Sequence, residues 1–141
     1  MTELVVVDGE NHILGRLGSY VAKLLLSGKR VVVLNAEKVV ISGKKHMVFE
    51  EFDKWMEIRG RANPRKGPKH YRRPDDLVRQ TIAGMLPKKK YKGRAALRRL
   101  RVYIGIPAEF KQVEKVRFPD AMADELACKF VTVGEVSKHL G

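Results

Sequence analysis

Residues 4–34 read LVVVDGENHILGRLGSYVAKLLLSGKRVVVL, and this stretch decides the fold. The apolar runs 4–7 and 31–34 have the form of short strands that are buried on both faces. Between them, leucines and a valine recur at helical spacing from Leu14 to Leu25, which predicts a helix that ends near Gly28. A strand, a helix and a strand within about 30 residues form a βαβ unit, so we expect the two strands to be parallel.

The middle of the chain continues this α/β pattern. Residues 39–41 are apolar and predict a third strand or an extended segment. Residues 48–59 carry Val48, Phe49, Phe52, Trp55, Met56 and Arg59 at helical spacing, which predicts a helix with an aromatic face. A further helix is expected to begin at Pro74, where two aspartates follow the proline, and to end at Pro87. Its predicted buried face consists of Leu77, Val78, Thr81, Ile82, Met85 and Leu86.

The last third contains a shorter helix, a strand and a terminal helix. The short helix is expected over 94–100, with Arg94, Arg98 and Arg101 on its outer face and Leu97 and Leu100 toward the core. Residues 102–104 predict a strand. In the C-terminal segment 108–141, Thr132 and Glu135 form a capping-box pattern, which indicates that this segment ends in a helix.

Length and composition favour a single folded domain. The chain has 141 residues, of which 44% are hydrophobic, so one domain spanning 1–141 has enough apolar side chains for a core. We therefore expect an α/β fold: a compact three-layer domain with a central, mainly parallel sheet flanked by helices, plus a basic irregular loop at about 60–74 that glycines and prolines interrupt.

The positive charge of the chain is concentrated in one segment. The net charge is +13, and residues 59–101 hold 16 Lys and Arg against two aspartates, whereas the rest of the chain is nearly neutral. A charge run is often a solvated face, but such faces usually mix both signs. The near absence of carboxylates favours a polyanionic partner, and nucleic acid is the main candidate.

The candidate RNA-binding residues all lie in this segment. Arginines grip phosphates with two hydrogen bonds and stack on bases, lysines act as mobile point charges, and an irregular basic loop suits folded RNA better than the DNA major groove. His70 and Tyr71 either stack on unpaired bases or, in the case of Tyr71, anchor the loop to the domain. The predicted RNA-binding set is Arg59, Arg61, Arg65, Lys66, Lys69, His70, Arg72, Arg73, Lys88, Lys89, Lys90, Lys92, Arg94, Arg98, Arg99 and Arg101.

An enzyme on a nucleotide-binding fold is the alternative that the βαβ start suggests. The segment 9–18 contains neither G-x-G-x-x-G nor a Walker motif. The four histidines are scattered without metal-ligand spacing, and Cys128 has no histidine near it in the sequence. We therefore predict no catalytic residue, no metal site and no cofactor.

Features of membrane or secreted proteins are missing from the sequence. Apolar runs span only a handful of residues, whereas a membrane-spanning helix needs about 20. The first residues do not form a signal peptide, and the single cysteine allows no intrachain disulfide. A cytoplasmic protein is expected.

Several motifs together resemble a known family. GMLP at 84–87, GR at 93–94 and the pattern of Leu100, Val102, Tyr103 and Gly105 are similar to the signature of the L13 family of large-subunit ribosomal proteins. Residues 7–9, 14–17 and 35–43 resemble other motifs of the same family in the same order, so the similarity covers 4 to about 107. The loop from Arg59 to Pro74 resembles the archaeal and eukaryotic branch, and the short length favours the archaeal type.

The resemblance implies a function without catalysis. It implies an α/β fold with a parallel sheet between helices, and a structural component of the large ribosomal subunit that binds and organises ribosomal RNA. The implied partners are that RNA and neighbouring large-subunit ribosomal proteins, with no membrane and no small-molecule substrate. Residues 108–141 match less distinctively, so their role stays open.

Overall fold

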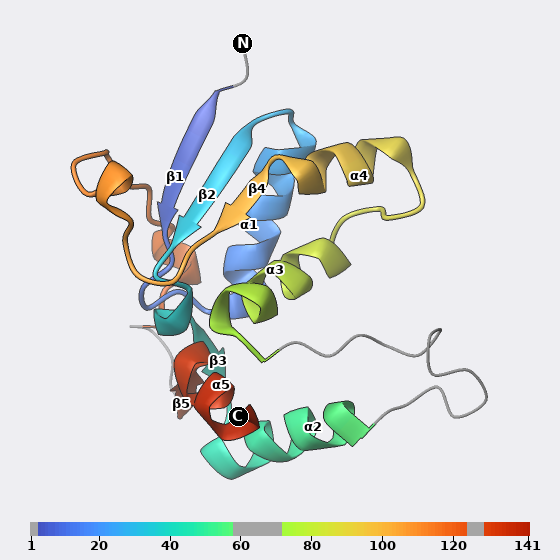
Figure 1. The fold of residues 1–141 in the computed structure, drawn as a ribbon, viewed down its shortest axis with the longest axis vertical. Coiled ribbons are helices and arrows are strands. Elements are labelled where there is room, and N and C mark those ends of the chain that lie inside the picture. Colours follow the sequence, from blue (N-terminus) through green and yellow to red (C-terminus); the bar gives the residue numbers. More distant parts are fainter. Residues whose placement is uncertain (1–2, 58–71, 124–128) are drawn as a thin grey trace.

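The computed structural model describes residues 3–57, 72–123 and 129–141 (Figure 1). Within these ranges the chain is an α/β domain with a mainly parallel sheet, as the sequence predicts. No helix in the described ranges is long and apolar enough to cross a membrane. The predicted basic loop falls mostly outside the described residues.

The predicted βαβ unit is confirmed. β1 (Leu4–Asp8) and β2 (Arg30–Leu34) pair in parallel, and α1 (Leu14–Leu26) connects them. α1 ends at Ser27, and Gly28 follows with a φ of 99°, a left-handed conformation that glycine adopts without steric cost.

A third parallel strand completes the main sheet. β4 (Leu100–Val102) pairs with the other edge of β2, which gives the strand order β1-β2-β4. α1, α3 (Pro74–Gly84) and α4 (Tyr91–Arg98) contact one another or the sheet. Figure 1 shows them together on one face of the sheet.

Alternation along the strands divides the apolar side chains between two faces. Leu17 and Leu25 of α1 belong to the same buried cluster as Val7, Val31 and Val33. The intervening residues form a smaller cluster on the opposite face, in which Val6, Val32 and Leu34 pack with Tyr103 and Phe110. Phe110 belongs to the 3-10 helix η3 (Ala108–Phe110), so the segment after β4 forms the thin third layer.

A two-stranded antiparallel sheet joins the middle of the chain to its end. β3 (Val40–Ser42) follows the 3-10 helix η1 (Ala36–Lys38) and pairs with β5 (Phe130–Thr132). The segment at 39–41 is thus a strand, one residue later than expected.

The predicted helices that flank this small sheet are confirmed. α2 (Lys45–Glu57) packs the rings of Phe49, Phe52 and Trp55 against the main core. α5 (Val133–Leu140) begins as predicted, because Oγ1 of Thr132 accepts a hydrogen bond of 3.2 Å from the N–H of Glu135.

The predictions for the α3–α4–β4 region need correction at their boundaries. α3 ends at Gly84 rather than at Pro87, and Met85 is 39% exposed instead of buried. The helix predicted over 94–100 is α4, which ends at Arg98, and the strand predicted over 102–104 begins at Leu100. The reason is pairing with β2: the N–H of Val31 donates to the carbonyl of Arg99, which draws the following residues into the sheet.

These boundaries change the two faces predicted for the short helix. Arg101 lies on β4 and not on the helix, and Leu100 is fully buried as a strand residue. Leu97 is only partly buried against the core, while Gly93 and Ala96 form the buried face of α4. Arg94 and Arg98 are exposed, as predicted.

The turn between α3 and α4 requires glycine at position 93. The carbonyl of Pro87 lies so close that a Cβ on Gly93 would be 2.0 Å from its oxygen. The same carbonyl accepts a hydrogen bond of 3.0 Å from the N–H of Lys90, and the neighbouring Leu86 is buried. The carbonyl is therefore held in place, and α4 can approach it only with glycine there.

We predict that Gly93→Ala destabilises the domain by about 1 to 3 kcal/mol, because backbone must move to admit the methyl group. Gly84→Ala is the matched control, since its Cβ would meet no atom within 4 Å and α3 favours alanine over glycine. Urea unfolding followed by circular dichroism measures both variants. Equal stability of the two would show that the contact with Pro87 does not constrain this turn.

Candidate nucleic-acid interface

The described part of the basic segment forms an exposed surface around α4. Its seven members, defined here as the α4 cationic surface, are Lys88, Lys89, Lys90, Lys92, Arg94, Arg98 and Arg101. All seven are exposed, and none forms an ion pair with a described residue. Repulsion among cations so close in the chain is left uncompensated within the described part of the protein.

The start of α4 adds to this positive field. The first turn of α4 contains no acidic residue, and no side chain caps its free N–H groups. In contrast, α3 begins with Asp75 and Asp76, and α5 has its threonine cap. The positive end of the α4 dipole and the lysines that precede it therefore contribute positive potential at the same place, which favours the binding of an anion.

Arg99 differs from its neighbours because its guanidinium has a partner inside the protein. Its Nη2 donates a hydrogen bond of 2.6 Å to the carbonyl of Leu25, at the C-terminal end of α1. The same carbonyl accepts a hydrogen bond of 3.1 Å from the N–H of Gly28, and a cation at this end of a helix stabilises the helix dipole. The structure thus gives Arg99 a role in joining α1 to β4, and its contact with RNA stays a prediction.

Arg72 and Arg73 lie at a different place from the α4 cationic surface. They precede α3, while Lys88 follows it, so a helix of 11 residues, roughly 16 Å long at 1.5 Å per residue, separates the two groups. Nε of Arg73 pairs with Asp75 at 3.4 Å, and the carbonyl of Arg72 accepts a hydrogen bond from Ser137 of α5.

The remaining predicted residues lie outside the described part of the chain. These are Arg59, Arg61, Arg65, Lys66, Lys69 and His70, together with Tyr71, for which two roles were open. Their contact with RNA stays a prediction.

Two residues that the sequence did not single out lie beside the predicted ones. Tyr91, the first residue of α4, is 75% exposed among the lysines. Arg30, the first residue of β2, lines a shallow pocket with Arg98, Arg99 and Arg101. No sequence signal identifies Arg30, because it joins the others only through the pairing of β2 with β4.

A buried polar cluster occupies the carboxyl end of β1. Oδ1 of Asp8 accepts hydrogen bonds from the side chain of Asn35 at 2.9 Å and from the N–H of Glu10 at 3.0 Å. Its Oδ2 accepts one of 2.9 Å from Arg117. Burial by itself would raise the pKa of Asp8, but these three donors together hold the pKa below its ordinary value.

His12 is the second member of this cluster and is fully buried. Its Nε2 accepts a hydrogen bond of 2.9 Å from the N–H of Phe118, and Nδ1 lies 3.1 Å from the carbonyl of Glu10. This pattern requires a neutral ring with its proton on Nδ1. Burial lowers the pKa of His12 below 6.5, which also favours the neutral ring.

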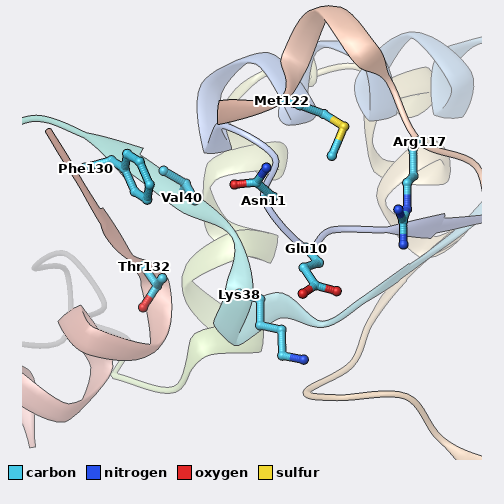
Figure 2. Close-up of a pocket in the computed structure, with 8 residues that line it drawn as sticks. All are labelled: Glu10, Asn11, Lys38, Val40, Arg117, Met122, Phe130 and Thr132. Atoms are coloured by element: carbon cyan, nitrogen blue, oxygen red, sulfur yellow. The ribbon is translucent and has the colours of Figure 1, made fainter. Parts of the chain in front are cut away.

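An open pocket of about 660 Å³ adjoins this cluster (Figure 2). The polar ends of Glu10, Lys38 and Arg117 gather on one side, and Val40 and Phe130 lie on the other. The described residues that line it include no cysteine, serine or histidine, and its ionisable side chains are Glu10, Lys38 and Arg117. Among the described residues, no group of three His, Cys, Asp or Glu side chains is placed to hold a metal ion.

Comparison with known proteins identifies the family of the chain. The family model for ribosomal protein L13 matches residues 2–109, which is more than half of the chain. The chain belongs to the ribosomal protein L13 family. The resemblance inferred from the GMLP, GR and neighbouring motifs is thereby confirmed.

Archaeal members of the family are among its relatives. The chain is 48% identical over 140 residues to the large ribosomal subunit protein uL13 of Sulfurisphaera tokodaii, covering 99% of this chain and 95% of the relative. It is 46% identical to that of Methanocaldococcus jannaschii, with 98% of both chains covered, and 45% identical to that of Archaeoglobus fulgidus, with 99% of this chain and 88% of the relative covered. The archaeal type that the sequence favoured is supported.

The alignment with the relatives also covers the C-terminal segment, residues 108–141. The family model ends at residue 109, but the relatives align along nearly the whole chain. Residues 108–141 are therefore part of the protein that the archaeal L13 relatives share. The bonds of Arg117 and Phe118 to the buried cluster show how part of this segment is tied to the parallel sheet.

Family membership also decides against the enzyme alternative. The L13 family is a structural, non-enzymatic one, so the prediction that the chain is not an enzyme is confirmed. In α/β enzymes, ligands bind at the carboxyl ends of parallel strands. Here Asp8 and Asn35 at that edge bond to each other, and Arg117 from the C-terminal segment completes the cluster.

We predict that acidification weakens the attachment of the C-terminal segment through His12. Because the folded-state pKa of His12 lies below 6.5, its contribution to stability is present above pH 6.5 and is lost as the pH falls below that value. Protonation of Nε2 also removes the acceptor of the Phe118 N–H bond. The free energy of unfolding, measured in urea between pH 8 and pH 5, should fall over this range.

The variant His12→Gln should be less stable at pH 7.5 and show a shallower pH dependence. His46→Gln is the control, since His46 is exposed on α2. If His12→Gln retains the full pH dependence of the free energy of unfolding, His12 is not the group responsible for that dependence.

Proposed function

We propose that this chain is a structural component of the large ribosomal subunit that binds and organises ribosomal RNA, using the α4 cationic surface and the basic loop that precedes α3. Membership of the L13 family supports the ribosomal role, and it implies a location on the ribosome in the cytoplasm. Neighbouring large-subunit ribosomal proteins are the second class of partner. No small-molecule substrate is part of the proposal.

The observation that carries the RNA-binding role is the set of seven exposed cations around α4 without acidic partners among the described residues. Phosphates of converging RNA segments repel one another, and arginines and lysines between them relieve that repulsion. The buried side of α4, formed by Gly93 and Ala96, fixes the helix on the domain. The cations are therefore presented from a rigid support.

Tyr91 and the uncapped start of α4 favour RNA over a diffuse anionic surface. An exposed tyrosine ring beside lysines is a platform on which an unpaired base stacks. Free N–H groups at the helix start bind a phosphate oxygen directly. Both features are specific in geometry, whereas a membrane surface would need only charge.

The first test is the salt dependence of binding. If about eight cations contact phosphate, log K for fragments of large-subunit ribosomal RNA should fall against log salt with a slope on the order of −6 to −7. Filter binding or fluorescence anisotropy at several salt concentrations gives this slope. A nearly flat dependence would contradict an electrostatic mode of binding.

The second test separates binding from stability with arginines that lie close in sequence. Arg94→Gln with Arg98→Gln removes two exposed cations, so the slope should shrink by about 1.4 to 1.8 while the melting temperature stays nearly unchanged. Arg99→Gln makes the same chemical change but removes the bond to Leu25, and should cost about 1 to 3 kcal/mol of stability. Calorimetry and RNA titration measure both quantities.

The assignment of these roles fails when the double variant loses stability, or when it binds RNA with an unchanged slope. Retention of full stability by Arg99→Gln would show that its bond to α1 contributes little.

A further inference from the structure

One face of the main sheet carries a shallow pocket whose apolar floor the proposed function does not use. In the register of the sheet, Leu4 lies beside Arg30 and Val32 lies beside Arg101. Alternation along the strands places these four residues on the face opposite α1, together with the Val6 and Val32 cluster. A pocket of about 320 Å³ opens there, near the lower limit of typical ligand sites.

The floor of this pocket is apolar and partly uncovered. Leu4, Val32, Tyr103 and Phe110 line it, and the rings of Tyr103 and Phe110 lie 5.8 Å apart between centroids. Leu4, the first residue of the edge strand β1, is 44% exposed. The segment after β4 therefore covers this face only in part.

The rim of the pocket is formed by four arginines: Arg30, Arg98, Arg99 and Arg101. None of the lining residues is acidic. The carboxylate of Glu3, which precedes Leu4, forms an ion pair with Lys29, with 3.6 Å between Oε2 and Nζ. The guanidinium of Arg101 is held by hydrogen bonds to the carbonyls of Leu100 at 3.1 Å and Arg98 at 3.4 Å. The rim thus offers planar cations, of which at least one is fixed in orientation.

We propose that this pocket holds one unpaired nucleotide of ribosomal RNA, with its base against the apolar floor and its phosphates on the arginines. The inference rests on the proposed function and adds a second contact to it. A flat base fits an apolar floor with a tyrosine ring, and guanidinium groups bind phosphate and stack on bases.

Continuity of charge favours RNA over an acidic protein segment. Arg98 and Arg101 belong both to this rim and to the α4 cationic surface, so a strand of RNA leaving the pocket passes directly onto the lysines of α4. A protein segment would need carboxylates to match the rim and a further acidic stretch to match α4. One polyanion satisfies both with its backbone.

The test is photo-crosslinking of the full chain bound to large-subunit ribosomal RNA that contains 4-thiouridine. Trypsin cleaves after Arg101 and Lys111, so the peptide 102–111 carries both Tyr103 and Phe110. We expect a nucleotide adduct on this peptide and adducts on peptides from the α4 region. Arg30→Gln should lower the yield on peptide 102–111 at least about threefold and leave the α4 adducts unchanged.

Lys138→Gln is the control, since it removes one exposed cation from α5, at the other end of the molecule in Figure 1. Adducts near α4 without any on peptide 102–111 overturn the pocket proposal and leave the proposed function intact. A second experiment uses a carboxylate-to-amine crosslinker on whole large subunits. If it joins a neighbouring protein to Lys29, beside the rim, and RNA does not label the pocket, the occupant is a protein and the pocket proposal is overturned. Absence of RNA binding altogether overturns both.

Discussion

The rest of the structure depends on β2, which is hydrogen-bonded to β1 along one edge and to β4 along the other. Its side chains from Val31 to Leu34 are buried on both faces of the sheet. Because a strand that is paired on both edges cannot shift without losing both ladders, β2 fixes the register of β1 and of β4 at once. That register then decides which residue of the basic segment faces which layer.

The position of β4 explains why adjacent arginines have different roles. Pairing with β2 begins at Arg99 and ends the helix, so Arg94 and Arg98 remain on α4. Arg99 then reaches the end of α1, whereas Arg101 lies on the open face of the sheet. A continuous helix would have placed Arg94, Arg98 and Arg101 on one side. The strand instead distributes the cations over two neighbouring surfaces, one around α4 and one on the open face of the sheet.

The buried cluster around Asp8 shows how the C-terminal segment is joined to this frame. Asp8, His12 and Asn35 come from the first 35 residues, and Arg117 and Phe118 meet them from the end of the chain. In a nucleotide-binding α/β protein the same edge of the sheet would bind phosphate. In this member of the L13 family, the polar groups at this edge bond to one another and to the C-terminal segment.

The local sequence determined most of the helices and strands and the concentration of positive charge in one segment. The local patterns are properties of neighbouring residues: apolar runs, helical spacing, the Thr132 cap and the concentration of charge at 59–101. The predictions that rest on them are confirmed for the βαβ unit, for α2 and α5, and for the exposure of Arg94 and Arg98. Tertiary structure decided what depends on residues far apart in sequence. Strand pairing and packing decided where α4 ends, that Arg99 bonds to Leu25, that Arg30 approaches the basic segment, and that Asp8 meets Arg117. The energies of these contacts depend on partners that are distant in sequence, so no local pattern contains them.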